Sequence, residues 1–349
     1  MVFVVYIRVK NIMNFNLPKT YRSKIIEGVS IPGIIKNGIY FFVDLEVYED
    51  GRVECWNFED FEHFKKHVKR GWVSVSIPNG SEISIHSLGD WTINDGSWNY
   101  DNDSFIDYVW SIVKQLNPNL TNLYTYSEKK VNGIRIGENG KGNVYKEKKR
   151  VPNDPFPERI KGEGINLFLL DANSEYHLVR FDIYSEDSII VNRFEEPFEL
   201  TLAQFEEMIS EGKVLTELPI GAQVHILGLG KFKIQEENYS EKISEKLLEV
   251  KDTIRVLRGE PSTLDVCREV YQQYMDNPTE TLKEKLKEAY ENIPEHERMY
   301  VGDMDVKDTE VRMIIYGEQE IENWSHYQVA KQWETSFHLL TSQNRKRNK

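Results

Sequence analysis

The sequence is poor in cysteine and has neither a long apolar run nor an excess of positive charge. Its 349 residues include two cysteines, Cys55 and Cys267, which lie far apart and form no CxxC pair, so neither a zinc ribbon nor a disulfide framework is expected. No apolar run is long enough to span a bilayer, and the apolar start over residues 1–7 is too short for the core of a signal peptide. We therefore expect a soluble, cytosolic protein.

The charge balance excludes some partners and favours others. The chain carries 57 acidic and 44 basic residues, a formal net charge of -13. Proteins that bind nucleic acids concentrate Lys and Arg, so this balance argues against a nucleic-acid partner and favours a basic protein partner. With 40% hydrophobic and 12% aromatic residues, the chain can still bury substantial cores, and its length predicts two to three domains.

The most informative feature that is present is an internal repeat. Residues 64–93 align without a gap with residues 205–234, and nine of the 30 positions are identical, where unrelated sequences would share roughly two. The identical pairs are Phe64/Phe205, Gly71/Gly212, Val73/Val214, Pro78/Pro219, Gly80/Gly221, Ile85/Ile226, Leu88/Leu229, Gly89/Gly230 and Ile93/Ile234. These residues are turn formers and core residues, so they indicate a duplicated domain. Residues of these types are informative about the fold of the domain and not about an activity.

Turn and cap residues predict the element order β-β-α-β-β in the first copy. Strands over 39–43 and 45–48 precede a turn at Glu49–Gly51, and the chain returns as a strand to make a hairpin. Asn57 or Asp60 can then cap a helix that ends at Gly71. The turn and alternating residues after the helix predict further strands.

The second copy follows the same plan. Residues 178–184 and 189–194 predict the hairpin, and Thr201 caps a helix that ends at Gly212. Between the copies, residues 103–116 place apolar side chains on one face of a helix, which we expect to cover the first sheet.

From about Ser240 the pattern becomes helical. We predict three charged helices, the third opened by a capping box of Thr281 and Glu284, then a strand over Val311–Tyr316 and a last helix. The predicted fold class is α+β, with two duplicated β-β-α-β-β domains followed by a mainly helical C-terminal module. The expected divisions are an N-terminal segment (1–29), a first repeat domain with its covering helix (30–126), a connector or hairpin (127–163), a second repeat domain (164–238), the helical module (240–340) and a basic tail (341–349).

One acidic segment is a candidate metal site. Asp303, Asp305 and Asp308 alternate along the chain, and His326 follows, so these side chains could bind a divalent cation. The spacing does not match an EF-hand loop. In the alternative interpretation the aspartates organise a turn and make local backbone bonds, and His326 is a packed or interfacial histidine.

A second segment is a candidate partner-binding loop. Asp95, Trp98, Tyr100 and Asp101 mix acidic and aromatic side chains, which could meet a basic partner. The alternative, which we prefer, is that this loop caps the helix that follows it.

Other patterns indicate no site. His63 and His67 share a helix face at a spacing able to bind a metal, but lysines surround them and no carboxylate accompanies them, so a solvated face is expected. His86 and His225 lie one residue out of phase in the two copies and make no paired site. The glycines at 228 and 230 fit neither a Walker loop nor a dinucleotide fingerprint.

Two segments resemble uncharacterised bacterial domain families. The first runs from Ile31-Pro32-Gly33 to Trp56-Asn57-Phe58, and the second from Tyr300 to Ala330. The resemblance implies a bacterial protein and carries no activity.

These observations lead to one function and two alternatives. We expect a bacterial cytosolic interaction protein, an immunity-like or regulatory factor that binds a macromolecular partner. We favour a function without catalysis, because no catalytic signature is present, and we expect no cofactor beyond a divalent metal ion at the acidic segment. The alternatives are a metal-dependent hydrolase or nuclease-like enzyme that uses Asp303, Asp305 and Asp308, and a sensor that binds a small ligand in the cleft between the repeats.

Overall fold

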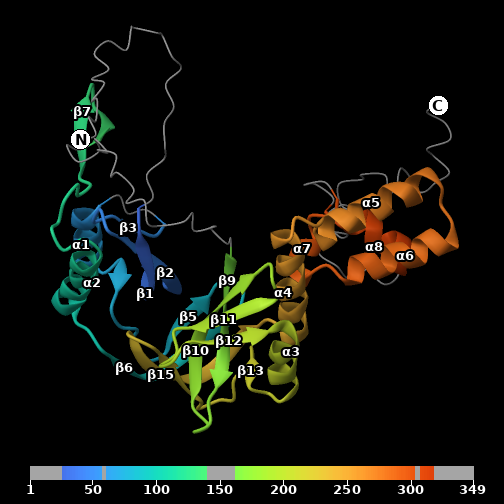
Figure 1. The fold of residues 1–349 in the computed structure, drawn as a ribbon, viewed down its shortest axis with the longest axis horizontal. Helices are drawn as coiled ribbons and strands as arrows, with labels where there is room; N and C mark the ends of the chain where they lie inside the picture. Colours follow the sequence, from blue (N-terminus) through green and yellow to red (C-terminus); the bar gives the residue numbers. More distant parts are fainter. Residues whose placement is uncertain (1–25, 57–59, 140–161, 303–306, 318–349) are drawn as a thin grey trace, which may run out of the picture.

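A computed structural model describes residues 26–56, 60–139, 162–302 and 307–317 (Figure 1). Both repeats contribute strands to one sheet. The elements of the first repeat are β1 (Gly28–Asn37), β2 (Ile39–Tyr48), β3 (Val53–Glu54), α1 (Phe61–Lys69), β4 (Val73–Ser74), β5 (Ser81–Ile85) and β6 (Gly89–Trp98). Those of the second are β9 (Gly162–Leu170), β10 (Tyr176–Tyr184), β11 (Ser188–Asn192), β12 (Phe198–Thr201), α3 (Leu202–Ser210), β13 (Val214–Leu215), β14 (Gln223–Ile226) and β15 (Gly230–Ser240).

The two repeats join through one antiparallel strand pair. Within the described residues, the main path of the 13-stranded sheet is β12-β11-β10-β14-β15-β6-β5-β2-β1-β4. At its centre β6 pairs with β15, and Ile93 lies opposite Ile234, its own counterpart in the repeat. The two copies are therefore related by a local twofold axis through this pair. We call the β6–β15 pair the seam.

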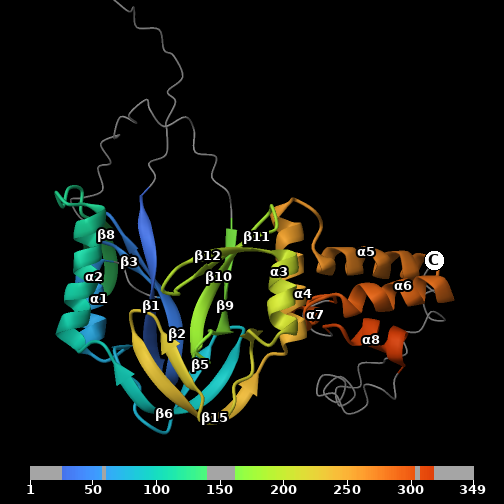
Figure 2. The ribbon, with the colours of Figure 1, turned by 60° about the horizontal axis from the view of Figure 1, so that its bottom comes forward.

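The sheet curves strongly, so that strands far apart in its order face each other. Figure 2 shows the seam at the base, with β1 and β2 on one side and β9 and β10 on the other. Arg180 of β10 reaches across to Asp44 of β2, and Trp91 of β6 packs edge to face on Phe168 of β9, with ring centroids 5.3 Å apart. One apolar core consequently runs through both repeats.

The α+β class and the duplication are confirmed, but each copy contains more strands than expected. β1 pairs with β2 over its whole length, although its sequence includes Pro32 and Gly33, which disfavour strands. A Cβ on Gly33 would lie 2.6 Å from the side chain of Leu45, so the close approach of the two strands requires glycine there. β9 is its equivalent in the second copy. The two expected strands over 39–48 are the single strand β2.

Several expected helix ends are confirmed and one is wrong. Asp60 and Thr201 cap α1 and α3, and Gly71 and Gly212 follow these helices with φ of 73° and 69°. The third C-terminal helix, however, begins one residue after Thr279, whose side chain accepts the Leu282 amide. The expected capping box of Thr281 and Glu284 therefore does not form, because those two residues lie inside the helix.

Helices cover the sheet and extend beyond it. α2 (Asn102–Leu116) lies with α1 on the first repeat, as expected, and 127–163 includes a hairpin, β7 (Tyr126–Val131) and β8 (Ile134–Asn139). The helices of the C-terminal part are α4 (Ile243–Leu257), α5 (Thr263–Asp276), α6 (Glu280–Glu291), α7 (Glu295–Arg298) and α8 (Thr309–Tyr316). α4 packs into the core of the repeats, with Val250 and Ile254 buried there. None of the helices in the described ranges is long and apolar enough to cross a membrane.

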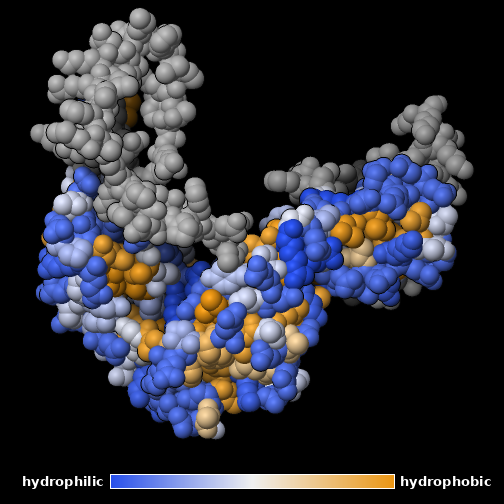
Figure 3. Space-filling view, viewed as in Figure 1, coloured by the Kyte–Doolittle hydropathy of each residue, from blue (hydrophilic) through white to orange (hydrophobic). Residues whose placement is uncertain are grey.

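The strand expected over Val311–Tyr316 is wrong, because this segment is the helix α8. Val311 and Ile315 are four residues apart and lie on one helix face, where they join a small second core with Cys267, Leu286 and Tyr290. A run of β-branched residues favours a strand locally, but burial against α5 and α6 decides the outcome. Figure 3 shows apolar residues of this module reaching the surface between α5 and α6, on a face that is otherwise largely hydrophilic.

Candidate functional site

The acidic segment expected to bind a metal lies mostly outside the described residues. Asp303, Asp305 and His326 are not among them, and their role stays a prediction. Asp308 is described, and it is buried and accepts a hydrogen bond from the Tyr290 hydroxyl. Burial, as the larger cause, and the Asp308 carboxylate, as the smaller, raise the pKa of Tyr290 above its ordinary value. The phenol therefore stays protonated and donates its hydrogen bond to Asp308.

The acidic aromatic segment is a loop only at its end, because Asp95 and Trp98 lie in β6, and this end caps α2 as the alternative interpretation expected. Asp101 accepts the Ser104 amide and forms a capping box at the start of α2, while Tyr100 stacks on Tyr108 with ring centroids 5.0 Å apart. Trp98 stacks on Phe232 at 6.3 Å. Asp95 pairs with Lys233 across the seam at 3.0 Å. Partner binding by these residues stays a prediction.

The structure instead gathers titratable side chains at the turn between β9 and β10. His177 on β10 and His225 on β14 are opposite each other in a parallel pair, and their ring centroids are 5.2 Å apart. Asp171 and Glu175 lie on the adjoining turn. Among the described residues, the only group of His, Cys, Asp and Glu arranged to hold a metal ion comprises Asp171, Glu175 and His177, whose ligand atoms lie within 4.8 Å of one another.

Backbone hydrogen bonds hold the turn that presents these carboxylates. Oδ1 of Asp171 accepts the amides of Asn173 and Glu175 at 2.9 and 2.8 Å, and its Oδ2 lies 3.1 Å from Nε2 of His177. Burial alone would raise the pKa of Asp171, but these hydrogen bonds outweigh it and lower the pKa, so the group is a carboxylate at neutral pH. The Phe194 ring stands nearly perpendicular to His177, at 88°, and supports the imidazole.

His225 is a neutral imidazole in this setting. Burial lowers the pKa of His225 below the ordinary histidine value, and the neighbouring His177 and Lys231 lower it as well. The carboxylates of Glu175 and Asp171 raise this pKa but do not outweigh the other effects. Its Nε2 lies 2.9 Å from the side-chain nitrogen of Gln223 and 3.8 Å from Oε1 of Glu175. When the Gln223 amide donates a hydrogen bond to Nε2 of His225, this nitrogen carries the lone pair of the neutral imidazole. It is also the ring nitrogen that lies near Glu175 of the 171–175 turn.

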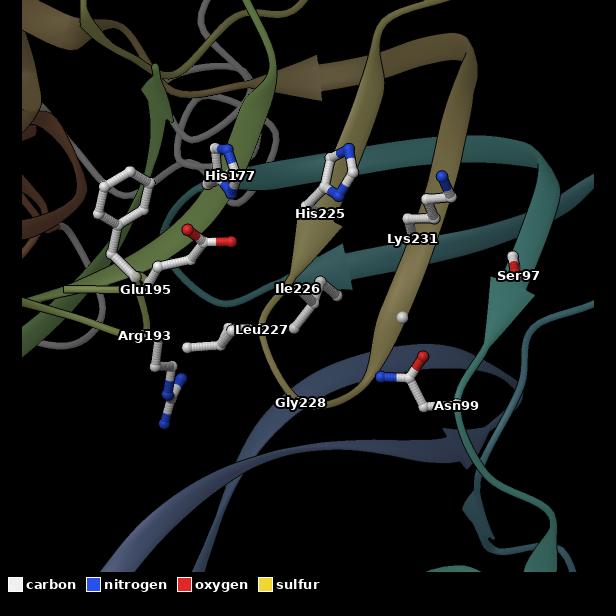
Figure 4. A pocket seen from close by; sticks show the side chains of 12 residues that line it. Ser97, Asn99, His177, Arg193, Glu195, His225, Ile226, Leu227, Gly228 and Lys231 are labelled. Atoms are coloured by element: carbon white, nitrogen blue, oxygen red, sulfur yellow. The ribbon is translucent and has the colours of Figure 1, made fainter. Parts of the chain in front are cut away.

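Both histidines also line a pocket of about 240 Å³ beside the seam, shown in Figure 4. We call it the seam pocket. β6 and the residues after it supply one wall, and β10, the β11–β12 loop and the β14–β15 hairpin supply the rest. Its lining is Ser97, Asn99, His177, Arg193, Phe194, Glu195, His225, Ile226, Leu227, Gly228, Gly230 and Lys231.

Arg193 ties the pocket wall to the other repeat. It sits in the β11–β12 loop with φ of 61°, and its guanidinium pairs with Asp44 at 2.6 Å and donates to Ser30 at 2.9 Å. Only 8% of its side chain is exposed. The loop that carries Phe194 and Glu195 is therefore anchored on β1 and β2 of the first repeat.

A comparison of equivalent positions in the two copies distinguishes residues that maintain the shared fold from residues found in the second copy alone. The parallel pair Phe41/Ser84 in the first copy occupies the register of His177/His225 in the second. β1 and β2 are joined through Gly38 alone, whereas the corresponding turn of the second copy spans 171–175. The cluster of Asp171, Glu175, His177 and His225 thus belongs to the second copy only, although both copies share the surrounding strands.

Sequence reasoning did not find this site. It considered His225 only in relation to His86 and did not consider Asp171, Glu175 or His177. One signal was present, since Asp171, Glu175 and His177 fall within seven consecutive residues at the start of β10. The pairing of His177 with His225 depends on β10 and β14 becoming neighbours, and the 47 residues that separate the two histidines conceal this in the sequence. His63 and His67 do not join any such group among the described residues, although Asp60, contrary to expectation, places a carboxylate oxygen 3.7 Å from Nδ1 of His63.

Comparison with known proteins identifies two domain families. A family model described as "Domain of unknown function (DUF7638)" matches residues 16–120 and again 150–261, one match for each repeat. A second, "Domain of unknown function (DUF7639)", matches residues 262–345. No curated protein and no solved structure matches the chain. The boundary at 261/262 follows α4, in agreement with the packing of that helix on the repeats. Because the first model covers more than half of the chain, the protein belongs to the DUF7638 family.

Proposed function

We propose that this protein is a small-ligand sensor that binds an anionic ligand in the seam pocket. The observation that carries the proposal is the origin of the lining, because Ser97 comes from the first repeat while His225 and Lys231 come from the second. A ligand held there contacts both copies. Its affinity would therefore depend on how the two halves of the sheet are arranged, which is what a sensor requires.

The chemistry of the lining favours an anion. The chain as a whole is acidic, yet the pocket presents the ammonium of Lys231 beside one carboxylate, that of Glu195, while the nearby Arg193 guanidinium is paired with Asp44. Lysine, arginine and an amide such as Asn99 are the groups that bind carboxylates and phosphates. Phe194 and Leu227 add apolar walls for the rest of a small organic molecule.

The Lys231→Ala variant tests this proposal. We expect inorganic phosphate or citrate to raise the free energy of unfolding of the wild-type protein by about 1–2 kcal/mol at ten times its Kd. Lys231→Ala should lose this gain because the ammonium is removed, and it can be followed by thermal denaturation at increasing anion concentration. Lys213→Ala, which removes an exposed lysine outside the pocket, is the matched control.

Equal stabilisation of all three proteins would show that the anions bind elsewhere and would overturn the pocket proposal. If the wild type responds as expected, the natural ligand can be sought among metabolites that copurify with the wild-type protein but not with Lys231→Ala.

A second candidate function is binding of a basic macromolecular partner, as expected from the net charge. An exposed aromatic cluster on the first repeat favours it. Trp56 is 54% exposed, and its ring centroid lies 5.3 Å from that of Phe41 and 6.3 Å from that of Trp72. Tilted aromatic rings at a surface bind lysine and arginine side chains through cation–π contacts, and an acidic protein attracts a basic segment.

For this second candidate we expect Trp56→Ala to reduce partner capture at least tenfold. Native mass spectrometry of the protein isolated from its natural cells would measure the partner directly. Tyr239→Ala, which removes another aromatic residue that is also 54% exposed, should leave capture unchanged. Equal capture by both variants would exclude the aromatic cluster as the binding surface.

A further inference from the structure

Two pairs of donor groups lie where the 171–175 turn adjoins the two histidines of the seam pocket. Nε2 of His177 lies 3.1 Å from Oδ2 of Asp171, and Nε2 of His225 lies 3.8 Å from Oε1 of Glu175. The two imidazoles are neighbours on adjacent parallel strands, and the two carboxylates lie on one five-residue turn. Two independent parts of the fold thus bring nitrogen and oxygen donors to one place.

These distances suit a small divalent cation. With bonds of about 2.0–2.2 Å, two donors of a tetrahedral zinc site are about 3.3–3.6 Å apart. The separations of 3.1 and 3.8 Å within the two pairs lie on either side of this range. Asp171, Glu175 and His177 already place ligand atoms within 4.8 Å of one another, and the His225 ring would have to move toward them to complete the set. The Gln223 amide, 2.9 Å from Nε2 of His225, would turn away to free that nitrogen.

We propose that the imidazoles of His177 and His225 and the carboxylates of the 171–175 turn bind one divalent transition-metal ion of the Zn²⁺ class. The donor set selects the metal. Imidazole nitrogens suit zinc and its neighbours, whereas Mg²⁺ and Ca²⁺ take oxygen ligands and, in the case of Mg²⁺, a strict octahedron with several waters.

The turn is built to present these donors. Oδ1 of Asp171 is occupied by two backbone amides, which leaves Oδ2 directed at the site, and Phe194 fixes the plane of His177. Only 13% of the Asp171 side chain and 15% of the His177 side chain are exposed, while Glu175 is about half exposed. The site therefore has an ordered inner half and an accessible outer half through which an ion can enter.

The metal site adds to the proposed function without depending on it. His177 and His225 line the seam pocket, so an ion between them would face any anion held there. Its binding nevertheless requires only the four donors, and it can be measured without an anionic ligand.

Titration calorimetry with Zn²⁺ on the full-length protein, stripped of metal with a chelator, tests the inference. We expect one ion per chain at this site. Glu175→Gln should weaken binding at least tenfold without unfolding the protein, because its side chain is half exposed and takes no part in the bonds of the turn. His225→Gln should weaken it further. Visible absorption of the Co²⁺-loaded protein should change in His225→Gln, since a nitrogen ligand is lost.

Two controls make the outcome decisive. His86→Gln removes an exposed histidine of the first repeat and should bind Zn²⁺ as the wild type does. Lys231→Ala should lose the anion effect but keep the metal, so the failures of the two proposals are distinguishable. If the wild type binds no Zn²⁺, or if Glu175→Gln and His225→Gln both bind it with wild-type affinity, the cluster is a set of structural hydrogen bonds and the proposal is wrong.

Discussion

Replacing Gly89 or Gly230 with alanine is expected to destabilise the protein by roughly 3 kcal/mol or more, because each glycine permits the seam to close. A Cβ on Gly89 would lie 2.4 Å from the backbone oxygen of Tyr239, and one on Gly230 would lie 2.4 Å from that of Ser97. Both contacts involve backbone atoms, which cannot rotate away. The φ angles of 156° and 152° add backbone strain for any other residue.

Urea denaturation measures this prediction, with Gly80→Ala as the matched control. Gly80 also has a positive φ, 76°, but a Cβ there would meet nothing within 4 Å. Its replacement should therefore cost only the backbone strain, about 1–2 kcal/mol. If Gly80→Ala and Gly89→Ala cost the same, close approach at the seam is not what requires glycine.

Replacing Phe168 with alanine is expected to cost about 3–5 kcal/mol, since a large buried ring is lost between the two repeats. Phe168 and its partner Trp91 are both fully buried, and their rings meet at 81°. Trp91→Ala should cost a similar amount. Because the two rings contact each other, the double variant should lose less than the sum, by about 0.5–1.5 kcal/mol.

A second cycle provides the comparison. Phe205 is equally buried but packs on Phe181 inside the second repeat, with ring centroids 5.4 Å apart. Phe205→Ala combined with Trp91→Ala should therefore be additive in urea denaturation. Additivity of the Phe168 and Trp91 variants as well would mean that the two repeats are not coupled through this contact.

The duplication gives the two copies a shared strand pair, the seam, and a pocket beside it. Each copy leaves an unpaired edge on β6 or β15, and pairing the two edges closes both and creates a wall shared by the copies. A small pocket at such a junction is a common position for a ligand site. His177, His225 and Lys231 of the second copy stand where the first copy has Phe41, Ser84 and Asp90, so only the second copy carries titratable groups able to form the proposed sites.

Local features were predictable because they depend on neighbouring residues. The caps Asp60 and Thr201 and the glycines after α1 and α3 act within one turn of helix, and the 103–116 helix has its own apolar face. The strand expected over Val311–Tyr316 failed for the opposite reason. Its apolar residues suit either element, and only packing against α5 and α6 selected the helix.

By itself the sequence determined the α+β class, the duplication, most helix ends and the acidic charge, since these follow from periodicity, turn chemistry and composition. Only the tertiary structure decided that the repeats share one sheet, that Arg193 bridges to Asp44, and that His177 meets His225 beside the 171–175 turn. The physical reason is that strand pairing is nonlocal. Every residue except proline offers the same backbone donor and acceptor, so the residue types do not specify which strands will pair. Side chains far apart along the chain therefore become neighbours only when the sheet forms.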